Sequence, residues 1–184
     1  MNQETKKSIY WVFGFVMVIW IIELVNLFTG HRLSSWGILP RTVKGLSGIP
    51  LSPFLHASLR HVMVNTIPLA TLGGFVILQG RRLFFEITII IILVSGSLLW
   101  LFGRSSYHVG ASGLIFGYFG YLVVRAWYDR SLRSFLIAFF TIFLFGGMMW
   151  GLLPTLSPVS WEGHLFGLLA GILAAYIEKY TKSA

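Results

Sequence analysis

Six apolar segments, separated by short polar stretches, constrain this chain more than any other feature of its sequence. They cover residues 9–28, 59–78, 83–102, 112–128, 134–153 and 163–178. A helix needs about 20 apolar residues to cross a bilayer, and only the fourth and sixth segments fall clearly short of that length. Because 56% of the residues are hydrophobic and 11% are charged, lipid must replace much of a soluble core. The sequence therefore predicts an all-α, polytopic membrane protein, a six-helix bundle forming one domain over residues 1–184.

The basic residues predict how the bundle is oriented. With six spans both termini share one side, which carries nine Lys and Arg residues against five on the other. Cytoplasmic loops are rich in Lys and Arg, so we expect both termini in the cytoplasm. The same rule accounts for the net charge of +8 without nucleic acid as a partner. The first segment is too long for a signal-peptide core and lacks a small-x-small cleavage site, so we expect it to span.

The connection over residues 29–58 mixes apolar and polar residues, which predicts a stretch lying in the membrane interface. Tryptophans near the segment ends are expected to be interfacial anchors: Trp11, Trp100, Trp127, Trp150 and Trp161. Four arginines are interpreted as charges at the membrane boundary: Arg104, Arg125, Arg130 and Arg133. The absence of Cys excludes disulfides, a thiolate nucleophile and a Cys-based metal site.

Polar residues gather at the start of the second, fourth and sixth segments. All three segments run from the outer to the inner face, so His61, Asn65, Ser112 and His164 fall at one membrane level. Polar side chains inside a membrane are costly and usually face the bundle interior or a wet cavity. From Ser112 to the inner boundary the helix covers roughly 20–25 Å, less than the core thickness of about 30 Å. We therefore expect the serine and His164 below the outer surface, at the floor of a cavity open to water.

Small residues predict that the fourth and sixth segments pack tightly. They recur every four residues along the sixth segment, at Gly163, Gly167, Gly171 and Ala175. The fourth segment carries Gly113, Gly117 and Gly120. Such stripes allow membrane helices to approach backbone to backbone, which should bring Ser112 and His164 within hydrogen-bonding reach.

This arrangement suits nucleophilic catalysis. A neutral imidazole can take the proton of a serine hydroxyl as the oxygen attacks a carbonyl. No Asp or Glu is placed to orient His164, so a dyad is expected, with Phe116 packing against the imidazole. The backbone N–H of Ser112, the Asn65 amide and His61 are candidate donors to an oxyanion. His61 and Asn65 are four residues apart, so they share one helix face.

These residues resemble the rhomboid family of intramembrane serine proteases, in its bacterial six-helix form. The matching motifs are Gly110-x-Ser112-Gly113, His61-x-x-x-Asn65 and His164-x-x-Gly167-x-x-x-Gly171, in the family's order and spacing. The resemblance implies Ser112 as nucleophile, His164 as general base, and His61 and Asn65 in the oxyanion hole. It further implies transmembrane proteins as substrates, no cofactor, and a site that opens to the outer face of a bacterial inner membrane.

Two positions depart from the family's pattern. The long connection has Ser52-Pro53 before Phe54 in place of the usual Trp-Arg pair. After Gly73-Gly74 the usual glutamate is missing, and Ile77 or Gln79 stands nearby. The resemblance implies that both positions support the structure, so these departures bear on loop anchoring and stability more than on catalysis.

Non-catalytic interpretations stay open at single residues. Ser112 is also a common helix-packing residue type, His61 can be an interfacial histidine without function, and Asn65 can join helices without a catalytic role. His56 and His108 are interpreted as wet or structural, although His56 can also line the cavity entrance, and His31 is interpreted as a loop residue. A metal site of His56, His61 and His164 lacks a recognised spacing. One further set forms either a lateral substrate gate or lipid-facing bulk: Phe143, Phe145, Met149 and Trp150.

Two other functions compete with proteolysis. A non-catalytic member of the family would bind membrane clients, but such proteins typically lack the serine or the histidine. A small transporter would be expected to show inverted repeats and a site at mid-membrane. The two halves of this chain are not visibly similar, and its polar cluster lies near one face.

Overall fold

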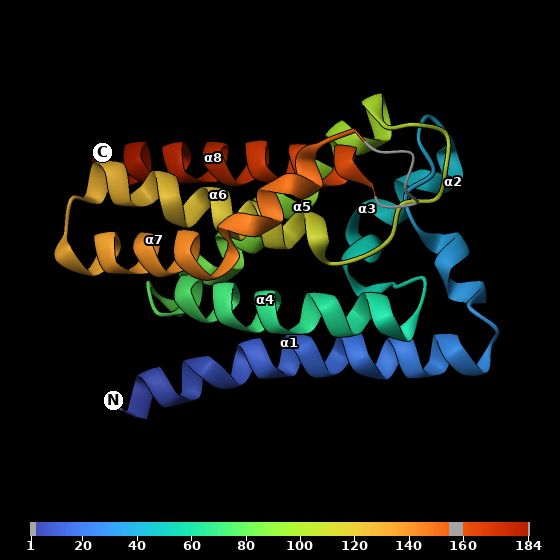
Figure 1. The fold of residues 1–184 in the computed structure, drawn as a ribbon, viewed down its shortest axis with the longest axis horizontal. Coiled ribbons are helices and arrows are strands. Elements are labelled where there is room, and N and C mark those ends of the chain that lie inside the picture. The colour runs from blue at the N-terminus through green and yellow to red at the C-terminus, as the bar shows by residue number, and fades with distance from the viewer. Residues whose placement is uncertain (1–2, 155–159, 184) are drawn as a thin grey trace.

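A computed structural model of the chain describes residues 3–154 and 160–183. Across these residues the chain is mostly helical and forms no β-strand (Figure 1). The longer helices are α1 (Gln3–Phe28), α4 (Leu59–Ile77), α5 (Arg81–Phe102), α6 (Ser112–Asp129), α7 (Leu132–Phe145) and α8 (Trp161–Ser183). Short helical turns connect them: η1 (Arg32–Trp36), α2 (Val43–Leu46), α3 (Gly48–Leu51), η2 (Ser52–Phe54) and η3 (Gly146–Leu152).

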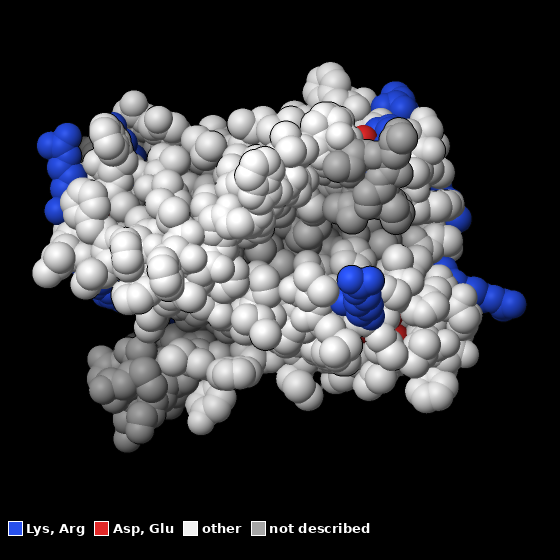
Figure 2. All heavy atoms as spheres, in the orientation of Figure 1, with Lys and Arg blue, Asp and Glu red and all other residues white. Residues whose placement is uncertain are grey.

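The chain is an integral membrane protein. Three stretches of the described chain are long and apolar enough to cross a membrane: Ser8–Phe28, Arg81–Phe102 and Leu132–Leu152. On the face in Figure 2, Lys and Arg side chains lie mostly toward the two ends of the long axis, with uncharged surface between them. The start of α1 and the end of α8 lie at the same end of the bundle (Figure 1).

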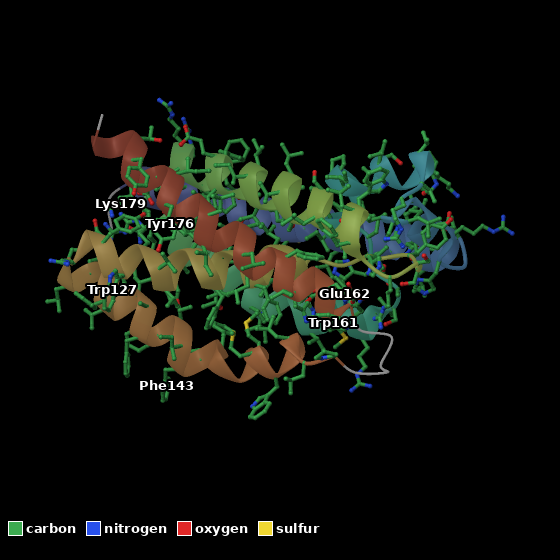
Figure 3. All side chains as sticks on the ribbon, turned by 90° about the horizontal axis from the view of Figure 1, so that it is seen from above. Trp127, Phe143, Trp161, Glu162, Tyr176 and Lys179 are labelled. Carbon is green, nitrogen blue, oxygen red and sulfur yellow. The ribbon has the colours of Figure 1, made fainter. Side chains whose placement is uncertain are left out.

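Aromatic side chains mark both ends of the bundle. Trp127 and Tyr176 lie toward the end that carries Lys179, whereas Trp161 lies at the opposite end (Figure 3). Trp127 is 80% exposed and Tyr176 is 48% exposed. Tryptophan and tyrosine prefer the level of the lipid headgroups, so these positions suit the boundaries of a membrane.

Three of the predicted segments have clearly different bounds in the structure. The first, predicted over residues 9–28, is the helix α1, which begins at Gln3. The fifth, predicted as one helix over residues 134–153, ends as α-helix at Phe145 and continues as the 3₁₀ turn η3. The change falls at Gly146-Gly147, and glycine is the least favourable residue after proline inside a helix. The sixth segment, predicted over 163–178, is the longer helix α8, which extends from Trp161 to Ser183 and carries the buried, hydrogen-bonded Glu178.

The glycines of α6 and α8 form the closest helix contact in the bundle. A Cβ on Gly167 or Gly171 would overlap the carbonyl oxygen of Gly113 or Gly117, respectively. A Cβ on Gly120 would lie 2.8 Å from the Leu168 carbonyl oxygen. Without side chains at these positions the two backbones meet directly, which fixes the separation and register of the two helices.

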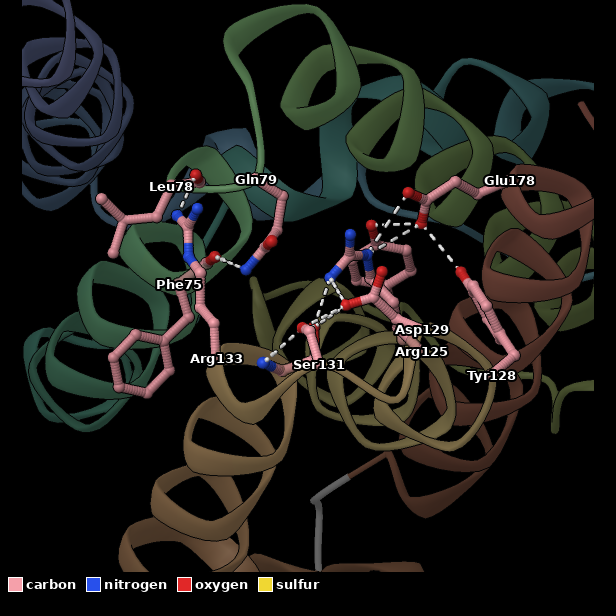
Figure 4. Close-up of polar contacts among 11 residues, drawn as sticks. Phe75, Leu78, Gln79, Arg125, Tyr128, Asp129, Ser131, Arg133 and Glu178 are labelled. Atoms are coloured by element: carbon pink, nitrogen blue, oxygen red, sulfur yellow. Dashed lines mark hydrogen bonds and ion pairs between the residues drawn. The ribbon is translucent and has the colours of Figure 1, made fainter. Parts of the chain in front are cut away.

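A buried carboxylate joins α6 to α8 at the end of the bundle that holds the C-terminus (Figure 4). Glu178 accepts hydrogen bonds from Tyr121 at 2.6 Å, from Tyr128 at 2.9 Å and from Arg125 at 3.2 Å. Arg125 also donates to Ser134 at 2.8 Å, which ties in the start of α7. Arg125, interpreted as a charge at the membrane boundary, lies at this end of the bundle with its side chain buried and paired.

After Gly73-Gly74, where the family usually has a glutamate, the end of α4 forms hydrogen bonds through backbone carbonyls. Gln79 donates to the Phe75 carbonyl of its own helix turn, and Arg133 donates to the carbonyl of Leu78 (Figure 4). The end of α4 is therefore tied to the start of α7 through a backbone carbonyl. The hydrogen bonds that Tyr121, Arg125 and Tyr128 of α6 donate at this end all reach Glu178, a carboxylate of α8.

The contact between α6 and α8 predicts the effect of one methyl group. Gly171→Ala should lower the free energy of unfolding by about 1–3 kcal/mol or more, because its Cβ meets the backbone of Gly117. Gly74→Ala is the matched control: it lies in α4 with open space around it and should change the value by less than about 1 kcal/mol. Unfolding of the purified variants in mixed micelles, titrated with a denaturing detergent, measures both. Equal stability of the two variants would contradict the tight contact.

Candidate active site

Ser112 is the first residue of α6 and lies at the mouth of a pocket between helices. The preceding Gly110 has φ +118°, a conformation that side-chain-bearing residues rarely adopt, and this turn allows the helix to start at the serine. Ser112 is half-buried. The pocket it lines is formed by the connection before α6, by α5 and by the start of α8, and it includes Ser52, Ser95, His108, Gly110, Ser160 and Gly163.

His164 is held from two sides on the first turn of α8. Its Nδ1 lies 2.8 Å from the carbonyl oxygen of Gly151, in η3. The ring of Phe116 stacks on the imidazole with centroids 4.3 Å apart and an angle of 9° between the planes. A carbonyl can only accept, so Nδ1 carries the proton and donates it to Gly151. In neutral His164, Nε2 is then the basic nitrogen, and no described residue is hydrogen-bonded to it.

The carbonyl of Gly151 is a partner that the sequence did not indicate. A backbone acceptor is available at every residue, so no residue type marks the one that the fold brings to an imidazole. Gly151 has little room for a side chain, because a Cβ there would lie 3.0 Å from Nδ1 of His164. The orienting role that an Asp or Glu has in a triad falls here to a peptide group.

The structure brings Ser112 and His164 to adjoining turns of packed helices without a direct bond. Phe116 is one turn after Ser112 on α6, and it is the residue whose ring covers His164. A Cβ on Gly113 would lie 3.3 Å from the carbonyl oxygen of Gly163, so the two helix starts touch. Within the described part of the chain, no hydrogen bond joins the Ser112 hydroxyl to the imidazole.

His61 and Asn65 face the turn before Ser112 from α4. A Cβ on Gly110 would lie 2.7 Å from both Cε1 and Nε2 of His61, and 3.6 Å from Nδ2 of Asn65. His61 is half-buried and Asn65 is buried. Both side chains therefore lie against the backbone that precedes Ser112. Gly167 and Gly171 lie further along α8, in its contact with α6.

His56 is buried behind this pair, in the connection between η2 and α4. Its Nε2 is 3.1 Å from Nδ2 of Asn65 and 3.4 Å from the backbone nitrogen of Ala111, and its ring meets that of His61 edge to face at 4.9 Å. Burial, with a smaller effect from the neighbouring His61, lowers the pKa of His56 to about 3. Of the two interpretations of His56, wet or structural, its complete burial supports the structural one, and the spacing from His61 was its only sequence signal.

His108 and Ser160 join the two helix starts on the far side of the pocket. Nδ1 of His108 is 2.7 Å from the Ser160 hydroxyl, which also accepts the N–H of Gly163 in the first turn of α8. Nε2 of His108 is 3.0 Å from the carbonyl of Arg104. Burial lowers the pKa of His108, so a neutral ring links the connection before α6 to the start of α8. His108, at 3% exposure, is structural rather than wet.

The four residues considered as a substrate gate lie on α7 and η3. Phe143 is 72% exposed and points away from the bundle (Figure 3). Trp150 is also exposed, whereas Phe145 and Met149 pack against the buried core. The set is thus divided between an outward face and an inward one.

The proposed trio of His56, His61 and His164 does not form a metal site in the described chain, where no group of three His, Asp or Glu side chains has a suitable geometry. Glu162, next to the candidate base, pairs instead with Arg104 at 3.5 Å. Ser112 and His108 line the described pocket, whereas His61, Asn65 and His164 lie outside its lining and contact the residues around Ser112.

The fold and the pocket define a polytopic helical membrane protein whose polar side chains converge at one end of the bundle. A model of the Rhomboid domain matches residues 43–181, and the chain belongs to the rhomboid family. It is similar to uncharacterized proteins of Mycobacterium bovis and Mycobacterium leprae, at 38% and 36% identity, with 95% of this chain covering 79% and 75% of theirs. It is also similar to a putative rhomboid protein of Acanthamoeba polyphaga mimivirus, at 28% identity over 65% of this chain and 68% of that one.

The turn before Ser112 predicts a difference between two alanine substitutions. Gly80→Ala introduces a Cβ at φ +142° in open space and should cost about 1–3 kcal/mol of unfolding free energy from backbone strain. Gly110→Ala carries a similar strain at φ +118° and adds an overlap with the His61 ring, so it should cost about 1–3 kcal/mol more. Unfolding titrations in micelles compare the two, and equal losses would mean that His61 does not press on Gly110.

Proposed function

We propose that this chain is an intramembrane serine protease that cleaves peptide bonds in or near the transmembrane segments of other membrane proteins. In this proposal Ser112 is the nucleophile and His164 the general base, in one domain of residues 1–184 with six spanning helices. The observation that carries the proposal is the hold on His164. With Nδ1 bonded to Gly151 and one face stacked on Phe116 of α6, Nε2 is the basic nitrogen of His164.

The acylation step follows from this geometry. As the Ser112 oxygen attacks the substrate carbonyl carbon, its proton passes to Nε2 of His164, and the carbonyl oxygen becomes an oxyanion. The intermediate collapses when the carbon–nitrogen bond breaks and His164 returns the proton to the leaving amine. In this proposal the serine–histidine hydrogen bond closes when substrate binds, since catalytic hydrogen bonds in free enzymes are often long or poorly aligned.

Deacylation uses the same two groups. A water molecule gives a proton to His164 and attacks the ester carbon, and Ser112 leaves as a hydroxyl when the proton returns to its oxygen. The oxyanion of each step requires donors, for which the Asn65 amide, His61 and the backbone N–H of Ser112 are the candidates. His61 and Asn65 both approach the place that a Cβ on Gly110 would occupy, two residues before the nucleophile.

The same proposal includes a topology and a location. Both termini are assigned to the cytoplasm, and the pocket at the start of α6 and α8 opens toward the outer face of a bacterial inner membrane. The excess of basic residues on the side of the termini supports the orientation. The mycobacterial relatives support a bacterial setting.

A non-catalytic, client-binding role is the alternative within the family. It would require neither a fixed imidazole tautomer nor a nucleophile at a helix start, and this chain has an arrangement suited to both. A transporter would require a pathway through mid-membrane, whereas the pocket described here lies at one end of the bundle.

Substitution of the dyad provides the direct test of catalysis. Ser112→Ala and His164→Ala should each reduce cleavage of a single-span substrate by about 10⁴-fold or more, because each removes a group that acts in covalent catalysis. Ser97→Ala, at an exposed serine of α5, is the matched control and should cleave like the wild type. Cleavage is measured by gel with purified protein in liposomes, beside labelling of Ser112 by a fluorophosphonate probe. A fully active Ser112→Ala or His164→Ala variant would remove the assignment.

Asn65 provides a separate test of the oxyanion hole. Asn65→Ala should slow turnover by about 10²–10³-fold without abolishing it, as expected when one donor of several is lost. The loss should fall on kcat rather than on KM, because the oxyanion exists only beyond the ground state. An unchanged kcat would exclude Asn65 from the oxyanion hole while leaving Ser112 and His164 in their roles.

A further inference from the structure

The family resemblance assigned no role to His56, yet this residue contacts two parts of the candidate site. The residue is completely buried, and Nε2 of its ring faces two nitrogen atoms, Nδ2 of Asn65 at 3.1 Å and the backbone nitrogen of Ala111 at 3.4 Å. Ala111 immediately precedes Ser112. One imidazole nitrogen therefore contacts both the helix that carries Asn65 and the turn that carries the nucleophile.

The protons at this nitrogen can be assigned by elimination. The backbone nitrogen of Ala111 is a donor only, so Nε2 of His56 must present its lone pair to it. The Asn65 atom beside the same lone pair must then be the NH₂ group rather than the carbonyl oxygen. This fixes which way the amide of Asn65 is turned, and its second N–H stays available on the side where Gly110 lies.

The backbone of His56 is held as firmly as its ring. Its carbonyl oxygen accepts a hydrogen bond from Nδ2 of Asn26 at 2.8 Å and another from the Ser34 hydroxyl at 3.0 Å. Asn26 is itself buried in α1, and its Oδ1 accepts the N–H of Leu33 at 3.0 Å. The backbone of His56 is thus hydrogen-bonded to α1, and α1 lies outside the residues that the Rhomboid model covers.

We propose that His56 is a positioning residue of the oxyanion hole: by accepting a hydrogen bond from Asn65, it holds the amide of that residue in the orientation that stabilises the transition state. This inference rests on the proposed protease function. His56 does not touch the substrate, and its effect on the reaction passes through Asn65. A buried, neutral acceptor suits this task, because its orientation does not have to change when negative charge develops nearby.

The test uses two replacements of different chemistry. His56→Gln keeps an acceptor, because the side-chain oxygen of glutamine reaches the place of Nε2, and should retain kcat within about threefold. His56→Phe keeps the ring without an acceptor and should lower kcat by about tenfold or more, with KM within about twofold. Cleavage of a single-span substrate in liposomes gives both constants, and detergent unfolding of each variant reports its stability.

A double mutant separates positioning from mere structural support. If His56 acts through Asn65, the His56→Phe/Asn65→Ala double variant should be no slower than Asn65→Ala alone, within about twofold. Multiplied losses in the double variant, or a His56→Phe variant that changes only KM, would overturn the proposal. Where His56→Phe does not fold, His56→Asn takes its place, because its polar atoms reach the position of Nδ1 and not that of Nε2; equal kcat for His56→Asn and His56→Gln would then overturn the proposal.

The outcomes also separate this inference from the protease assignment. A wild-type protein that neither cleaves nor reacts with the fluorophosphonate contradicts the protease function, and the positioning role with it. An active wild type with an unaffected Asn65→Ala variant contradicts the positioning role alone, because Asn65 would then have no effect to transmit.

Discussion

The direct contact between the backbones of α6 and α8 is the constraint on which the rest of the structure depends. Gly167 and Gly171 lie against the carbonyl oxygens of α6, with no space for even one methyl group. This contact sets the register of the two helices, so that Phe116 faces His164 and the helix starts meet at Gly113 and Gly163. In a membrane, where apolar burial gives little drive for helix association, such close packing carries much of the energy.

Polar groups secure this helix pair at both of its ends. At one end the carboxylate of Glu178 collects two tyrosine hydroxyls and the Arg125 guanidinium. At the other, His108 bonds the Ser160 hydroxyl that accepts from the first turn of α8. Unpaired polar groups are expensive in a low-dielectric interior, so these satisfied clusters favour one helix register over its neighbours. The glutamate that the family resemblance led us to expect on α4 is missing, and a carboxylate on α8 stands at this end of the bundle.

The candidate site uses neutral groups held by backbone atoms in place of a charged triad. The Gly151 carbonyl orients His164, and the Asn65 amide contacts the neutral ring of His56. A carboxylate buried beside the imidazole as the third member of a triad would carry a large desolvation cost inside a membrane protein. Peptide groups supply the same orientation without a net charge, at the price of requiring an accurate fold around them.

The sequence by itself determined the helical membrane class and the family, and it predicted the residues of the candidate site. Hydrophobic segments of spanning length and small residues at a spacing of four are local patterns that can be recognised without coordinates. The motifs around Ser112 and His164 were also legible, because they depend on rare polar residues in apolar surroundings.

Only the tertiary structure decided which backbone groups serve these side chains and which charges are buried. The pairing of Gly151 with His164, the burial of Arg125 and the contacts of His56 all join residues far apart in the chain. The end of the fifth α-helix at Phe145 was not predicted either, although the two glycines that follow it are visible in the sequence. Sequence patterns report the type and period of side chains, whereas backbone partners and burial depend on how distant helices come to pack.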